Sequence, residues 1–162
     1  MSESPDNAGV RIPPPLFYAA AVVVGLLLDG VHSLPITPIT VGSGFSRIVP
    51  VVGWLLIAGW AFLMFGAFVL FRRHRTSVLP IRPATALVVA GPYRFTRNPM
   101  YVGLALLTVA FGLSLNTWWP IILLVPTLFI IRNYVIAREE RYLHRRFGAE
   151  YGAYTRQVRR WL

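Results

Sequence analysis

The chain has 162 residues, of which 56% are hydrophobic, and its mean hydropathy is +0.58. Its net charge of +10 comes from arginine without any lysine, and the arginines fall between long apolar runs and in the last part of the chain; this is typical of a membrane protein oriented by basic loops, and with no nucleic-acid-binding motif present we expect no nucleic-acid partner. The absence of cysteine excludes disulfides, thiolate metal ligands and a cysteine nucleophile.

Two apolar stretches predict two membrane-spanning helices in the first half of the chain. Residues 1–15 are polar and then proline-rich, which we interpret as a flexible lead that ends at a helix start. The first span is expected over residues 16–34, with Asp29 near its end. An acid at that place is either functional or simply reaches the interface, and the sequence leaves both open. After a turn-rich connection, residues 48–71 are uncharged and long enough to span.

The second half begins with a long arginine-rich connection that runs to about Asn98. Two further apolar stretches, residues 100–115 and 118–136, are separated by a short polar step and predict a helical hairpin over residues 99–136. The tail, residues 138–162, is rich in Arg, Tyr and Glu and predicts a helix that stops near Gly148.

These elements together predict an all-α integral membrane protein with about four transmembrane helices, a cytoplasmic cofactor-binding loop and a C-terminal helix. We divide it into the lead, two N-terminal transmembrane helices at 16–71, and a catalytic region at 72–162. Because arginine gathers in the loop after the second span and in the tail, we expect these regions and both termini to be cytoplasmic. The lysine-free, arginine-rich composition favours a bacterial source, and hence the plasma (inner) membrane.

Residues able to carry chemistry gather in two clusters. One is TALVVAGPYRFTRNPMYVG at 85–103, and the other is REERY at 138–142, followed by the FGAEYGAYTRQVRRW stretch. The alternative, in which the second cluster has no function, is a solvated helix end with weak ion pairs. The three histidines, His32, His74 and His144, are far apart and lack carboxylates at ligand spacing, so no metal site is expected.

The two clusters together resemble the isoprenylcysteine carboxyl methyltransferase and phospholipid methyltransferase superfamily, in its bacterial branch, over roughly the C-terminal half of the chain. The resemblance implies S-adenosylmethionine as methyl donor and S-adenosylhomocysteine as product, bound at the cytoplasmic end of the bundle. The residues that it implies in donor binding are Thr85, Ala86, Leu87, Val88, Tyr93, Asn98, Pro99, Met100, Tyr101 and Glu139, with Glu140 as a neighbour that shares the role.

The sequence departs from the superfamily pattern at two positions. Asn98 stands where many relatives have histidine, which puts in doubt a role that needs an imidazole proton. Val135 stands where the eukaryotic enzymes have a substrate-side arginine, and we interpret Arg132 or Arg138 as its catalytic substitute because both lie nearby.

The expected acceptor is a lipophilic molecule that enters from the membrane: an isoprenylcysteine-like carboxylate, a phospholipid headgroup or another small lipophile. No strong general base is evident, which favours an acceptor that is already nucleophilic. Two other functions stay open, an NADPH-dependent membrane reductase of the sterol-reductase type and a non-enzymatic lipid-binding membrane protein. The sequence does not indicate the oligomeric state.

Overall fold

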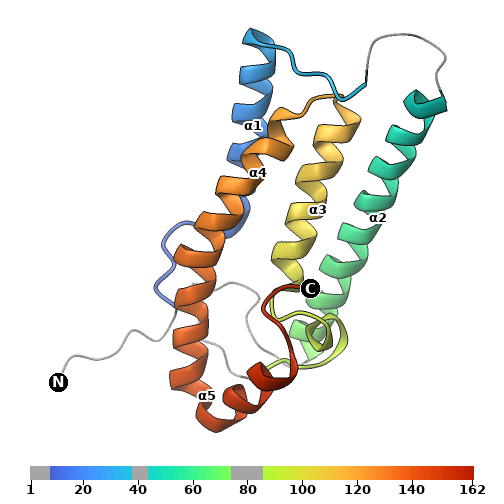
Figure 1. Ribbon diagram of the computed structural model, residues 1–162. Coiled ribbons are helices and arrows are strands. Elements are labelled where there is room, and N and C mark those ends of the chain that lie inside the picture. The colour runs from blue at the N-terminus through green and yellow to red at the C-terminus, as the bar shows by residue number, and fades with distance from the viewer. Residues whose placement is uncertain (1–7, 38–43, 74–85) are drawn as a thin grey trace.

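The computed structural model describes residues 8–37, 44–73 and 86–162, and these residues form helices and connections without a strand (Figure 1). The all-α prediction is therefore confirmed. The elements in chain order are α1 (Pro14–Val31), α2 (Gly44–Arg73), the 3-10 helix η1 (Gly91–Arg94), α3 (Pro99–Ser114), α4 (Trp119–Ile130), the π-helical turn η2 (Ile131–Ile136) and α5 (Ala137–Gln157).

The four predicted apolar helices all form, and they identify a membrane protein. Three helical stretches in the described parts of the chain are long and apolar enough to cross a membrane: Pro14–Val31, Val51–Leu70 within α2, and one within Trp119–Gln157, which comprises α4, η2 and α5. The fourth, α3, has 16 residues, so its length of about 24 Å is less than the hydrocarbon core of a typical bilayer.

Helix α3 lies between α2 and α4, and α1 packs along α4 (Figure 1). Large apolar side chains cover the outside of the bundle; Trp54, Phe62, Phe65, Val125 and Phe129 are all exposed. Such a surface is what a bundle presents to lipid, where exposed apolar side chains are not penalised.

Close approach of α1 and α4 depends on a glycine. A Cβ atom added to Gly25 would lie 2.8 Å from the backbone nitrogen of Pro120, which is nearer than such atoms tolerate. Small residues at helix contacts are a common means of tight packing in membranes, because backbones can then approach each other.

The connection after α1 is tied to the turn between α3 and α4 by a polar cluster, which we call the Asp29 knot. The Asp29 carboxylate accepts hydrogen bonds from Thr117 Oγ1 at 2.8 Å and from the Leu34 backbone at 3.1 Å. Asn116, at a positive φ of 54°, accepts from the Thr37 backbone at 2.8 Å. Asp29 therefore helps to join these two connections.

The first helical segment of the tail ends at Gly148, as the sequence predicts: the backbone there is non-helical, with φ 50° and ψ −118°, and a second helical segment follows the bend to Gln157. One other feature differs from the sequence-based expectation. Residues 8–10 of the lead are packed, since Ala8 and Val10 are buried in the core with Tyr18 and Ile131, whereas residues 11–13 are exposed.

Candidate functional site

The two clusters singled out in the sequence meet where the first turn of α5 lies against the start of α3. Tyr101 Oη donates a hydrogen bond to Glu139 Oε1 at 2.6 Å. The next residue, Glu140, forms an ion pair with Arg97, with 3.3 Å between Arg97 Nη1 and Glu140 Oε1. Arg97 and Tyr101 are four residues apart, and the two glutamates are adjacent. The two segments are thus joined by two neighbouring side-chain contacts.

Glu139 is a half-buried acid with an aromatic hydroxyl as its hydrogen-bond donor. It follows the apolar stretch that ends at Ile136, and burial raises the pKa of its carboxyl above the usual value, while the hydrogen bond from Tyr101 opposes that shift and the charge of Glu140 adds to it. Tyr93 lies near enough to feel the same carboxylate: burial first, and then the charge of Glu139, raises the pKa of Tyr93. Tyr93 therefore stays protonated.

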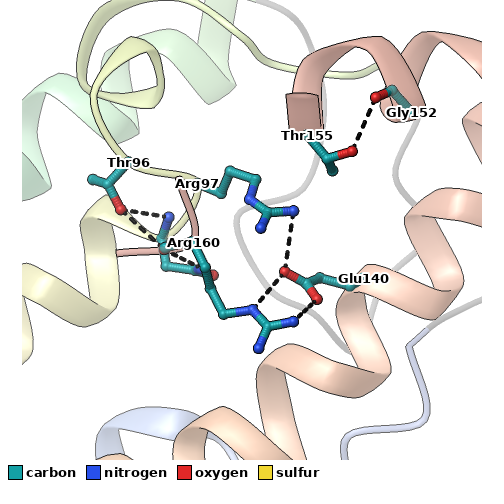
Figure 2. Close-up of polar contacts among 7 residues, drawn as sticks. Thr96, Arg97, Glu140, Gly152, Thr155 and Arg160 are labelled. Carbon is teal, nitrogen blue, oxygen red and sulfur yellow. Dashed lines mark hydrogen bonds and ion pairs between the residues drawn. The ribbon is translucent and has the colours of Figure 1, made fainter. Parts of the chain in front are cut away.

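The last residues of the chain complete the cluster around Glu140 (Figure 2). Arg160 binds the Glu140 carboxylate through two nitrogens, Nε to Oε1 at 2.9 Å and Nη2 to Oε2. Side-chain exposure is 16% for Arg97, 19% for Glu140 and 33% for Arg160. The three charged groups are thus largely shielded from water. Ion pairs in such surroundings are stronger than ion pairs at an open surface.

Asn98 and Pro99 are both buried at the start of α3. The Asn98 carbonyl accepts from the backbones of Tyr101 and Val102, at 3.1 Å each. Its side-chain amide donates to the backbone carbonyl of Arg160 at 2.8 Å. The side-chain amide of Asn98 therefore binds the tail. A contact between Asn98 and the methyl donor stays a prediction.

The other expected donor-binding residues lie on the segment that leads into η1 and on the first turn of α3. Val88 is buried, Ala86, Leu87 and Met100 are half-buried, and Thr85 lies outside the described residues. Tyr154 Oη donates to the backbone carbonyl of Tyr93 at 2.7 Å and so holds η1 against the tail.

The two arginines expected to be catalytic lie apart from the contacts around Glu139. Arg138 Nη1 donates to the carbonyl of Gly9 at 3.0 Å, and its guanidinium lies 4.4 Å from the centre of the Tyr134 ring. Arg132 is exposed on η2, and Val135 is fully buried. The catalytic assignment of these arginines stays a prediction.

Sequence reasoning missed Arg97, Arg160 and Tyr154, all three of which hold the site together. Arg97 could have been found from its position four residues before Tyr101, since the second cluster offers two adjacent acids as partners for these two side chains. Arg160 gave no such signal, because it is one of several arginines in the tail. Within residues 8–37, 44–73 and 86–162, no group of three metal-binding side chains comes together.

A family model described as phospholipid methyltransferase matches residues 48–150. Together with the apolar helices, this match places the chain in the class of membrane methyltransferases. The match covers more than half of the chain and contains the Arg97, Tyr101, Glu139 and Glu140 contacts. The chain belongs to the phospholipid methyltransferase family, and the resemblance found in the sequence is confirmed.

One relative is described only as an uncharacterized protein, from Haemophilus influenzae. The two sequences are 41% identical over 66 residues, which cover 39% of this chain and all of that protein. No solved structure matches the chain significantly.

Proposed function

We propose that the protein is an S-adenosylmethionine-dependent methyltransferase that methylates a lipophilic acceptor at the membrane surface. The observation that supports this most is the contact between Tyr101 and Glu139, two residues 38 positions apart, which joins the two sequence clusters into one site. The donor site would comprise Tyr93, the start of α3 and Glu139.

The side chains present suit the chemical groups of the donor. A half-buried carboxylate such as Glu139 can accept hydrogen bonds from ribose hydroxyls or from an ammonium group. The rings of Tyr93 and Tyr101 can face a cation, which an aromatic face attracts. Bound S-adenosylmethionine would supply an electrophilic methyl group on a sulfonium.

The protein's own contribution would be binding, orientation and exclusion of water. In the transfer, the bond between sulfur and methyl carbon breaks, the acceptor's lone pair forms the new bond, and S-adenosylhomocysteine leaves. A carboxylate acceptor becomes a neutral ester and needs no base, whereas an amine acceptor must release a proton. Because Glu139 is engaged by Tyr101, an acceptor of the first kind needs the fewest additional groups.

Calorimetric titration of the detergent-purified protein with S-adenosylhomocysteine tests the proposal. We expect binding in about the micromolar range, weakened about tenfold or more in Glu139→Ala. Glu150→Ala is the matched control, since Glu150 is an exposed acid on the same helix. Binding of NADPH alone would replace the proposal with the reductase, and binding of neither compound would leave the non-enzymatic lipid-binding protein.

The arginine distribution further supports a cytoplasmic site in the inner membrane of a bacterium. Because the chain has no cysteine, a single Leu162→Cys substitution can be labelled in spheroplasts with a membrane-impermeant maleimide. Protection in intact spheroplasts and labelling after lysis would support this orientation, and labelling in intact spheroplasts would contradict it.

A further inference from the structure

Three segments that are distant in sequence converge on Glu140. Arg97 comes from the segment before α3, Glu140 from the first turn of α5, and Arg160 from the end of the chain, beside the lower end of α3 in Figure 1. Figure 2 shows both guanidinium groups directed at the one carboxylate.

Both oxygens of Glu140 are engaged in these contacts. Oε1 accepts from Arg160 Nε and pairs with Arg97, and Oε2 accepts from Arg160 Nη2. Glu139 is the next residue toward the membrane, about 100° away around the helix, and it faces Tyr101. Adjacent acids thus serve different partners, so a ligand could use Glu139 without displacing an arginine, but could not use Glu140 in the same way.

The backbone of the last residues reinforces this attachment. The Arg97 backbone donates to the carbonyl of Arg159 at 2.9 Å. The carbonyl of Arg160 accepts from Thr96 Oγ1 at 3.2 Å and from Asn98 Nδ2 at 2.8 Å. Residues 159–160 therefore lie along residues 96–98, directly before the helix that carries Tyr101.

We propose that residues 158–162 form a clamp that fixes the segment before α3 onto α5, and that Glu140 and Arg160 are positioning residues of the donor site and not donor ligands. The clamp holds the start of α3 at the distance from α5 at which Tyr101 reaches Glu139. This inference rests on the proposed function only in naming the donor site; the clamp itself is a statement about the ligand-free protein.

The absence of cysteine makes the clamp directly measurable. Leu162 is 79% exposed, so a nitroxide on Leu162→Cys reports the motion of the tail by continuous-wave electron paramagnetic resonance. We expect restricted motion in the otherwise unchanged protein, and a mobile spectrum when Glu140→Gln or Arg160→Ala is added. Arg159→Ala is the matched control: it removes the same charge from an exposed side chain and retains the carbonyl that Arg97 uses.

Titration with S-adenosylhomocysteine on the same variants tests the positioning role. Affinity should fall about tenfold in Glu140→Gln and Arg160→Ala, and stay within about twofold in Arg159→Ala. Arg160→Lys should recover part of both readouts, because it restores the charge without the two-pronged contact. Partial rescue also guards against a variant that merely fails to fold.

The outcomes separate the clamp from the proposed function. A tail that stays restricted in both Arg160→Ala and Glu140→Gln, or that is released equally by Arg159→Ala, overturns the clamp. Loss of binding in Glu140→Gln with the tail still restricted makes Glu140 a ligand and also overturns the proposal. If the unchanged protein does not bind S-adenosylhomocysteine but the label responds as expected, the proposed function fails and the clamp stands.

Discussion

The two ends of the bundle both use buried or half-buried acids to join distant segments, but with different partners. At the Asp29 knot, one carboxylate meets a hydroxyl and a backbone amide. At the opposite end, Glu140 pairs with two arginines, while Glu139 accepts a hydrogen bond from Tyr101. An acid within or beside a membrane span can thus serve to join distant segments, and our proposal for Glu139 depends on its partner leaving the carboxylate able to accept a ligand.

The largest effect on stability is expected from adding a side-chain atom at the close contact between α1 and α4, near the Asp29 knot. Gly25→Ala places a Cβ 2.8 Å from the Pro120 backbone nitrogen, and overpacking of this kind costs about 1–3 kcal/mol. Thermal unfolding in detergent measures it. Gly30→Ala is the control, because a Cβ there meets no atom within 4 Å; equal losses in both variants would contradict the packing argument.

Removing the acid of the knot should lower stability without touching the site. Asp29→Ala leaves Thr117 Oγ1 and the Leu34 backbone without their acceptor, at a cost of about 1–3 kcal/mol. Asp29→Asn retains one acceptor oxygen and should lose less. Binding of S-adenosylhomocysteine by the folded protein should stay unchanged in both; a specific loss of binding would give Asp29 a functional role after all.

The other end should respond to pH through Glu139. Because its pKa is raised in the folded protein, the folded state holds more protons than the unfolded state at pH values between the ordinary and the raised pKa, and stability falls as pH rises through that window. Binding of a ligand by the ionised carboxylate should instead strengthen over the same range. Glu139→Gln should flatten both profiles, and profiles that persist in this variant would assign the effect to another group.

The smallest effect is expected from restoring the residue common in the superfamily. In Asn98→His, an imidazole N–H can replace the amide that donates to the Arg160 carbonyl, so stability should change by no more than about 1 kcal/mol. Increased methyl transfer with unchanged donor affinity would indicate that the imidazole proton matters in catalysis. A large loss of stability would show that the contact with the tail requires an amide.

The membrane helices could be predicted because they depend on local composition. The side-chain contacts of Arg160 and Asp29 could not be predicted, because they depend on residues far away in the sequence. Long apolar runs identify the helices, since lipid-exposed backbone must satisfy its hydrogen bonds within the helix. The motif resemblance selected Tyr101 and Glu139, which the structure joins. Arg160 could not be singled out, because nothing in a run of arginines shows which one reaches a carboxylate 20 residues away. The role of Asp29 likewise depends on Thr117, 88 residues distant.

The π-helical turn η2 (Ile131–Ile136) joins α4 to α5 and forms the end of the apolar stretch that begins in α4. One residue added to or removed from a helix rotates everything beyond it by about 100°. The π-helical turn therefore changes the rotation of α5 relative to α4. The face of α5 that carries the two glutamates need not continue the helical repeat of the lipid-facing side of α4. A single-residue deletion within η2 would consequently turn Glu139 away from Tyr101 but shorten the apolar stretch by only one residue, so that the chain could still insert into a membrane without assembling its site.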